Sequence, residues 1–215
     1  MSGSEPDYSL YVVTDRELMN APSLESAVEQ AVRGGATLVQ LREKTASSLE
    51  FYRTAVSVKK VTDSFGIPLI VNDRADIALA AGAAGLHVGQ DDLPVPAARR
   101  LIGDGILGVS VSNVEEALSA QKDGADYLGV GAMFPTATKT DAEAVSMEEL
   151  KRIRSAVSIP IVVIGGIHQK TVPLFRGTGI DGIAVVSAVM ATKDIQSAAR
   201  ELKELFLAAK EGTDR

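Results

Sequence analysis

Polar side chains at alternate positions end one apolar run in the first quarter of the chain, in the sequence Gln40-Leu41-Arg42-Glu43-Lys44. In a β-strand, a side-chain period of two places Gln40, Arg42 and Lys44 on one face. Leu41 and Glu43 then lie on the other face. Two cations and an amide on one face could hold a phosphorylated ligand. The alternative interpretation is a strand end that passes into a solvated, charged turn.

Carboxylates follow the next two apolar runs, at Asp73 and at the pair Asp91-Asp92. Carboxylates on neighbouring strands repel one another unless a cation lies between them. Oxygen ligands beside phosphate favour Mg2+ over softer metals. Taken singly, Asp73 could cap a helix, and Asp91 or Asp92 could belong to a turn before Pro94. As a set opposite Arg42 and Lys44, they indicate a diphosphate and metal site.

Hydroxyls and glycines follow later runs. Ser110 could donate to the same phosphates, although a lone Ser before a helix is more often a cap. The connection 131–141 is long and rich in Thr, which is typical either of a functional lid or of a solvated loop. Gly165-Gly166 and Val186-Ser187 could offer backbone N–H groups to a second phosphate, although a tight turn also explains the glycines. His87 lies within an apolar run, so we interpret it as a hydrogen-bonded interior residue without a catalytic role.

Composition excludes several classes of site. The chain has no Cys and two His, which excludes disulfides, thiolate catalysis and zinc sites built from Cys or several His. Its formal charge is -6 and its pI is about 5.0, which argues against nucleic-acid or anionic-membrane partners. The polar N-terminal segment predicts neither a signal peptide nor a spanning helix, so we expect a cytoplasmic protein. Oligomeric state stays open, with a homo-oligomer possible.

The elements that must position these residues are short apolar runs separated by helical stretches. Capping patterns at Ser47…Glu50, Ser112…Glu115 and Ser146…Glu149 mark three helix starts. Alternating strands and helices without a linker predict one (β/α)8 TIM barrel over residues 1–215, with flexible tails at 1–8 and 211–215. In such barrels the active site lies at the carboxyl ends of the strands. The eight expected strands are Leu10–Val13, Thr37–Leu41, Leu69–Val71, Gly85–Val88, Ile106–Val109, Tyr127–Val130, Ile161–Ile164 and Ile183–Val186.

Six motifs at these strand ends, in this order, resemble those of the thiamine-phosphate synthase family, and the match runs from about Leu10 to the last helix. They are Gln40-Leu41-Arg42-Glu43-Lys44, Val71-Asn72-Asp73-Arg74, His87-Val88-Gly89-Gln90-Asp91-Asp92, Gly108-Val109-Ser110, Phe134-Pro135-Thr136-Ala137-Thr138-Lys139 and Ile164-Gly165-Gly166-Ile167. The stretch 140–145 departs from the family pattern, because it is more acidic and less rich in Pro. That departure bears on lid closure and not on the chemistry.

The resemblance implies a Mg2+-dependent transferase with two phosphorylated small-molecule substrates. A pyrimidine-methyl diphosphate would ionise, and the thiazole nitrogen of a thiazole phosphate would capture the cation, which yields thiamine phosphate and pyrophosphate. Arg42, Lys44 and Lys139 would stabilise the departing charge, with Ser110 also in the catalytic set. The family places Gln40, Leu41, Arg42, Glu43, Lys44, Asn72, Ser110 and Lys139 around the pyrimidine diphosphate, Thr136, Ala137, Thr138, Gly166, Val186 and Ser187 around the thiazole phosphate, and Asp73 and Asp92 on Mg2+.

Asp92 is chosen over Asp91 because the family's acid lies two residues past the Gln of this motif. Two other functions remain as alternatives: a thiazole tautomerase on the same barrel, and a non-catalytic sensor of a phosphate ligand. A tautomerase would not need the carboxylates and the diphosphate-binding cations together. An assay with both substrates distinguishes the three functions.

Overall fold

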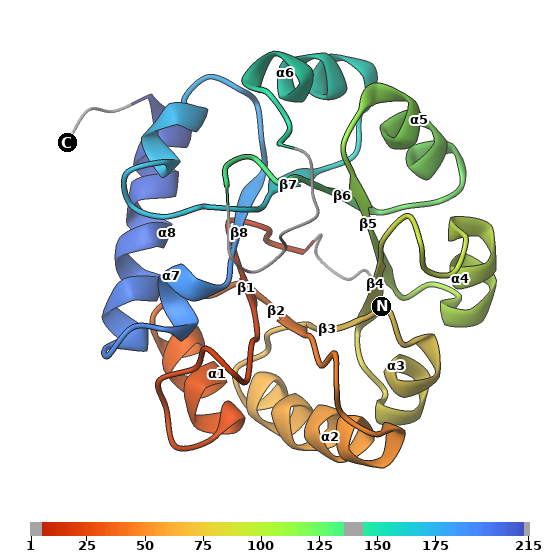
Figure 1. Ribbon diagram of the computed structural model, residues 1–215, viewed down its shortest axis with the longest axis vertical. Coiled ribbons are helices and arrows are strands. Elements are labelled where there is room, and N and C mark those ends of the chain that lie inside the picture. The colour runs from red at the N-terminus through yellow and green to blue at the C-terminus, as the bar shows by residue number, and fades with distance from the viewer. Residues whose placement is uncertain (1–5, 136–143, 213–215) are drawn as a thin grey trace.

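The computed structural model describes residues 6–135 and 144–212, and these form a closed parallel barrel of eight strands surrounded by helices (Figure 1). Each strand pairs with the next along the chain, and β8 closes the barrel against β1. The predicted barrel is therefore confirmed. The strands are β1 Leu10–Val13, β2 Leu38–Leu41, β3 Leu69–Asn72, β4 Gly85–Val88, β5 Ile106–Val111, β6 Tyr127–Val130, β7 Ile161–Val163 and β8 Gly182–Val185.

The helices form the outer ring of Figure 1. They are α1 Leu24–Arg33, α2 Ser48–Ser64, α3 Ala75–Ala81, α4 Val95–Ile102, α5 Val114–Lys122, α6 Met147–Ala156, α7 Ser187–Met190 and α8 Ile195–Glu211. After β7 the described chain forms a 3-10 helix, η1 (Val172–Phe175), where a regular helix was expected. Gly177 and Gly179 follow with positive φ and turn the chain into β8. Within the described ranges, no helix combines the length and apolarity needed to cross a membrane.

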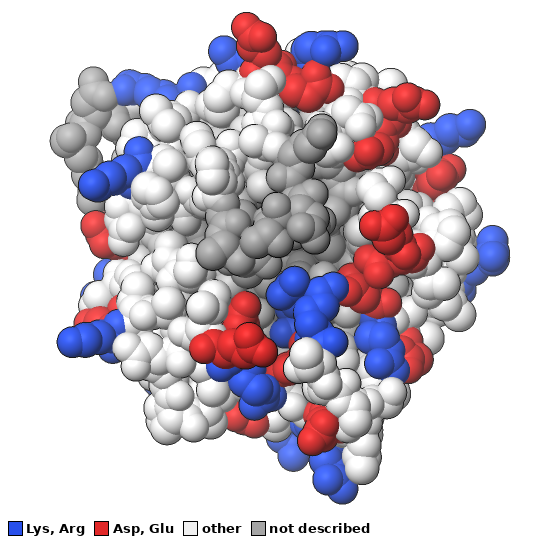
Figure 2. Space-filling view, viewed as in Figure 1, with Lys and Arg blue, Asp and Glu red and all other residues white. Residues whose placement is uncertain are grey.

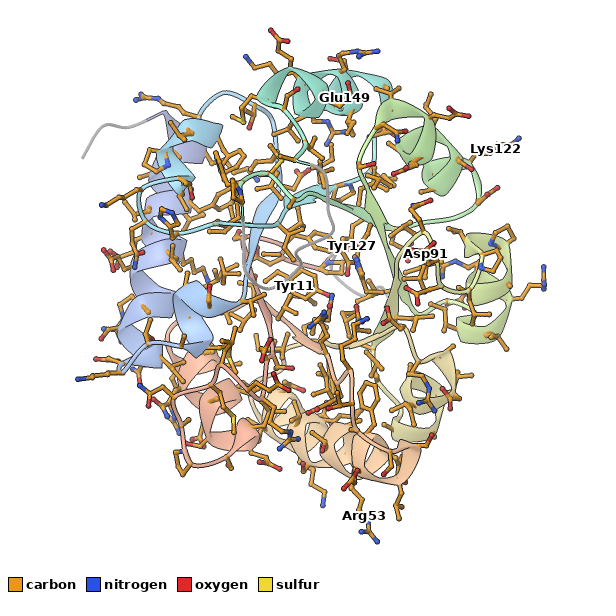
Figure 3. All side chains as sticks on the ribbon, in the orientation of Figure 1. Tyr11, Arg53, Asp91, Lys122, Tyr127 and Glu149 are labelled. Carbon is orange, nitrogen blue, oxygen red and sulfur yellow. The ribbon has the colours of Figure 1, made fainter. Side chains whose placement is uncertain are left out.

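The strand period of two sorts side chains into two hydrophobic clusters. In β1, Leu10 and Val12 belong to the large core shared by the strands and the surrounding helices. Tyr11 and Val13 belong to a smaller cluster inside the barrel. Figure 3 shows Tyr11 near Tyr127 at the centre of the ring. Tyr8 falls in the segment expected to be a flexible tail, but its side chain is buried and packs on Tyr127.

The predicted helix starts differ in how well they match the structure. Ser47 and Glu50 form the full reciprocal capping box at the start of α2. Ser146 accepts from the Glu149 backbone as expected. At α5 the predicted register is wrong by one residue: the cap is Asn113, whose side chain accepts from the backbone of Glu116.

The physical reason for the shift at α5 lies in the preceding strand. β5 continues to Val111, two residues further than the apolar run indicates. The Glu116 carboxylate accepts from the backbone N–H of Ser112, the residue before the Asn113 cap, so Glu116 takes the place that was predicted for Glu115.

A glycine on β5 makes room for the aromatic centre of the barrel. A Cβ at Gly108 would overlap the Tyr127 ring and the His87 imidazole. We therefore expect Gly108→Ala to lower the free energy of unfolding by about 1–3 kcal/mol, the usual cost of overpacking a core. Chemical denaturation of both proteins measures this difference. Because the added Cβ meets the Tyr127 ring, the same substitution should cost less in a Tyr127→Ala background; an equal loss in both backgrounds would contradict the packing explanation.

Candidate active site

A cavity of about 300 Å³ opens at the carboxyl ends of the strands. In Figure 2, positively and negatively charged side chains gather beside the centre of one face, over β2–β4. The cavity brings together predicted residues from six strand ends, which agrees with the usual location of a barrel active site. Those predicted residues are Gln40, Arg42, Lys44, Asn72, Asp73, Asp92, Ser110, Gly166, Val186 and Ser187.

The end of β2 alternates as the period of two predicts. Gln40, Arg42 and Lys44 line the cavity. Leu41 is fully buried in the outer core, and Glu43 instead forms an ion pair with Arg16, with 2.8 Å between Oε1 and Nη2. The side chains of Leu41 and Glu43 therefore do not line the cavity, so a ligand contact from either would involve its backbone.

Arg42 is held at its backbone. Its N–H donates to the hydroxyl of the fully buried Thr14 at 3.1 Å. Within residues 6–135 and 144–212, the Arg42 guanidinium forms no ion pair. A planar cation on a fixed backbone, without a carboxylate partner there, is suited to bidentate binding of a phosphate.

The carboxylates of Asp73 and Asp92 meet at the ends of β3 and β4. Lys44 Nζ lies 2.7 Å from Asp73 Oδ2. Burial raises the pKa of Asp92, and a hydrogen bond with the Asp73 carboxyl raises it further. The backbone N–H of Gly89, 2.7 Å from Asp92 Oδ2, acts in the opposite direction and lowers this pKa. Two acidic groups thus share one small volume, where a cation would relieve their repulsion.

Local backbone geometry determines which carboxylates reach the cavity. Asp73 has a φ of 62°, a left-handed conformation that Asp tolerates better than most residues. Asp91 is exposed and does not line the cavity, whereas Asp92 does. Figure 3 labels Asp91 beside β4, away from the tyrosines at the centre. The geometry therefore favours Asp92 over Asp91 as the second acidic group of the site.

A chain of buried hydrogen bonds forms the floor of the cavity. Gln40 Nε2 donates to the Tyr11 hydroxyl at 2.8 Å, and the Tyr11 and Tyr127 hydroxyls are 2.8 Å apart. His87 Nδ1 lies 2.9 Å from the Tyr127 hydroxyl, and His87 Nε2 lies 2.9 Å from Ser110 Oγ. Burial raises the pKa of Tyr11 and Tyr127, so both phenols remain neutral.

Sequence reasoning missed both tyrosines. The available signal was a tyrosine at an inward position of a strand, because a buried phenol needs a hydrogen-bond partner inside the barrel. His87 is buried and hydrogen-bonded in the interior, as expected for it. His168 lies in the turn after β7 and also lines the cavity.

The opposite side of the cavity is built from backbone. Gly165 and Gly166 both have positive φ, and the Thr171 hydroxyl stabilises the turn by donating to the Gly166 carbonyl at 3.1 Å. Val186 and Ser187 line the cavity where α7 begins. The first N–H groups of a helix have no partner within it, so this side can receive an anion. Four predicted residues, Thr136, Ala137, Thr138 and Lys139, lie outside the described residues.

Comparisons with known proteins identify the family of this chain. The chain is 62% identical over 202 residues to the thiamine-phosphate synthase of Clostridium beijerinckii, covering 94% of this chain and 97% of that protein. It is 60% identical over 205 residues to the thiamine-phosphate synthase of Ruminiclostridium cellulolyticum, covering 95% and 98%.

A solved structure extends the similarity to three dimensions. The thiamine phosphate pyrophosphorylase of Pyrococcus furiosus is 40% identical, with a TM-score of 0.89 over 95% of this chain and 98% of that one. The family model described as thiamine monophosphate synthase matches residues 10–189, which include every strand of the barrel. The chain therefore belongs to the thiamine monophosphate synthase family.

Proposed function

We propose that this protein is a thiamine-phosphate synthase that joins 4-amino-2-methyl-5-(diphosphooxymethyl)pyrimidine to 4-methyl-5-(2-phosphooxyethyl)thiazole. The bond between the pyrimidine methylene carbon and the diphosphate oxygen breaks, and its electron pair leaves with pyrophosphate. The thiazole nitrogen then donates its lone pair to the methylene carbon. The observation that carries this proposal is one cavity with cations and paired carboxylates on one side and a glycine turn with a helix start on the other.

The side of the cavity formed by β2–β5 is our proposed site for the pyrimidine diphosphate. Arg42 and Lys44 would bind the diphosphate and stabilise the charge that develops as it leaves. Lys139 is proposed for the same role. Gln40, Asn72 and Ser110 would complete the polar contacts from the cavity wall, with Leu41 and Glu43 contributing backbone groups. This chemistry needs no protein nucleophile and no strong base.

Asp73 and Asp92 are the proposed ligands of Mg2+. Their fit rests on two meeting carboxylates, one of which has a raised pKa. In the described part of the chain, no group of three or more His, Cys, Asp or Glu could hold a metal ion. Two carboxylates suit Mg2+, which usually binds one or two carboxylates together with substrate phosphates and water. Bound there, Mg2+ would neutralise negative charge on the diphosphate oxygens.

The thiazole phosphate is assigned to the opposite side, at Gly166, Val186 and Ser187, with Thr136, Ala137 and Thr138 proposed from the family resemblance. Barrels often bind a phosphate at the loops after strands seven and eight. In this arrangement the diphosphate lies over β2–β5 and the acceptor phosphate lies over β7 and β8. The two rings would then meet between the charged groups, above the tyrosine floor.

A side chain at position 166 should act selectively on the acceptor. A Cβ there would lie 2.7 Å from Phe134 Cβ and 3.0 Å from the Pro135 carbonyl oxygen. We expect Gly166→Val to raise the KM for the thiazole phosphate by about tenfold or more, equal to ~1.4 kcal/mol of binding, with a much smaller change for the pyrimidine diphosphate.

Calorimetric titration of each ligand into the folded variant measures this selectivity. Because Gly166 has a φ of 65°, Val there strains the turn, and thermal stability should fall under either explanation. If Gly166 only permits the turn, both ligands should be affected about equally. Undiminished binding of the thiazole phosphate would remove Gly166 from the acceptor site.

The proposed function is tested by incubating the protein with Mg2+ and both substrates and measuring thiamine phosphate and pyrophosphate in equal amounts. Isomerisation of the thiazole alone would identify a tautomerase. Binding of the phosphorylated ligands without turnover would identify a sensor. Either result would overturn the proposal.

A further inference from the structure

The hydrogen bonds on the cavity floor have a direction that follows from counting their protons. The amide nitrogen Nε2 of Gln40 can only donate a hydrogen bond, so the Tyr11 oxygen accepts from it. The single Tyr11 proton is then available to the Tyr127 oxygen, 2.8 Å away. The Tyr127 proton is available in turn to His87 Nδ1 at 2.9 Å. Each neutral phenol thus accepts from one side and donates to the other.

This order determines which ring nitrogen of His87 carries the proton. If Nδ1 accepts from Tyr127, the neutral imidazole has its proton on Nε2. Nε2 lies 2.9 Å from Ser110 Oγ, so the serine oxygen accepts and its own proton remains to be donated. In the reverse direction the Tyr11 oxygen would accept from both Gln40 and Tyr127, and the proton of the buried Tyr11 hydroxyl would have no acceptor among the described hydrogen bonds, which is costly.

The packing around His87 keeps the ring in this orientation. Gly108 on β5 and Gly129 on β6 leave the space that the ring occupies: a Cβ at Gly129 would lie 3.1 Å from His87 Cε1. Tyr127 packs against the same ring, with 5.6 Å between the centroids. Rotation of the imidazole is therefore sterically restricted, and its two nitrogens keep separate partners.

We propose that His87, oriented by Tyr11 and Tyr127, is a positioning residue that makes the Ser110 hydroxyl a hydrogen-bond donor toward the leaving diphosphate. Ser110 lines the cavity on the same side as Arg42 and Asp92. A hydrogen-bond donor that is already oriented before the substrate binds does not have to reorient when negative charge develops on the diphosphate. This inference rests on the proposed function, because it takes the diphosphate to lie beside Ser110.

The protonation of His87 can be measured without substrate. Long-range proton–nitrogen NMR correlation of ¹⁵N-labelled protein distinguishes the protonated ring nitrogen from the bare one. The chain has two histidines, so a His168→Gln variant assigns the signals. We expect neutral His87 with its proton on Nε2, and a shift of the Nδ1 resonance in Tyr127→Phe. A proton on Nδ1, on both nitrogens, or an unchanged Nδ1 resonance in Tyr127→Phe would overturn the proposal.

Kinetics then tests whether Tyr127 acts through Ser110. We expect Tyr127→Phe to lower kcat by about tenfold, which is ~1.4 kcal/mol, while the KM of each substrate stays within about twofold. Ser110→Ala should lower kcat at least as much. The double variant should be no slower than Ser110→Ala alone, because the effect of Tyr127 requires the serine hydroxyl. Losses that multiply in the double variant would show that Tyr127 has only a structural role.

Two further variants keep the test informative. If Tyr127→Phe does not fold, Tyr11→Phe takes its place in the test. It removes the preceding donor of the chain and should also slow turnover. Tyr52→Phe removes a hydroxyl from an exposed site on α2 and should leave kcat unchanged. An inactive wild-type protein would count against the proposed function, whereas full activity in folded Ser110→Ala would overturn the positioning role alone.

Discussion

Asp73→Asn and Asp92→Asn should each lower the Mg2+-dependent rate by about two to three orders of magnitude, which corresponds to ~3–4 kcal/mol of transition-state stabilisation. Each change removes one carboxylate from a pair in contact, and the amide retains an oxygen near its hydrogen-bond partners. The Mg2+ concentration needed for half-maximal rate should rise as well. A chelator should abolish wild-type activity, and added Mg2+ should restore it.

The neighbouring carboxylate supplies a matched control. Asp91 is exposed and does not line the cavity, so Asp91→Asn should keep the wild-type rate and Mg2+ dependence. Thermal unfolding verifies that all three variants are folded. If folded Asp73→Asn kept the wild-type rate and Mg2+ dependence, the metal assignment would be wrong.

Arg42→Lys is expected to lower kcat/KM, with a loss of about 1–3 kcal/mol of transition-state stabilisation, even though the charge is retained. The reason is that one ammonium group cannot reproduce two parallel N–H donors. Steady-state kinetics and calorimetric titration of the pyrimidine diphosphate measure the loss.

Arg53→Lys is the control, since Arg53 is exposed on α2 and points away from the barrel in Figure 3. A twofold change in turnover corresponds to less than ~0.5 kcal/mol of transition-state stabilisation. A turnover of Arg42→Lys within that range of wild type, with unchanged affinity for the diphosphate, would leave no role for the paired N–H donors of the Arg42 guanidinium.

The sequence by itself determined the architecture and predicted much of the cavity lining. Apolar runs between helical stretches predicted every strand, because a parallel strand that is buried on both faces is mostly apolar. The period of two correctly separated Arg42 from Glu43, since adjacent side chains of a strand point to opposite faces. These are local rules, and neighbouring residues are enough to apply them.

Boundaries and contacts across the barrel depended on tertiary structure. The cap of α5 moved to Asn113 because β5 continues further along its neighbours than its own apolar run indicates. Strand length is set partly by hydrogen bonds to adjacent strands, as where Ser110 and Val111 pair with β6. A local pattern does not contain that information.

The centre of the barrel shows the same limit most clearly. Tyr11 and Tyr127 are 116 positions apart in the chain, yet their hydroxyls are in contact. Likewise, the sequence placed Asp73 and Asp92 on neighbouring strands, but their contact depends on the left-handed backbone at Asp73 and on the Gly89 N–H that holds Asp92. Strand closure and side-chain rotamers decide such contacts, because each couples residues that are remote in sequence.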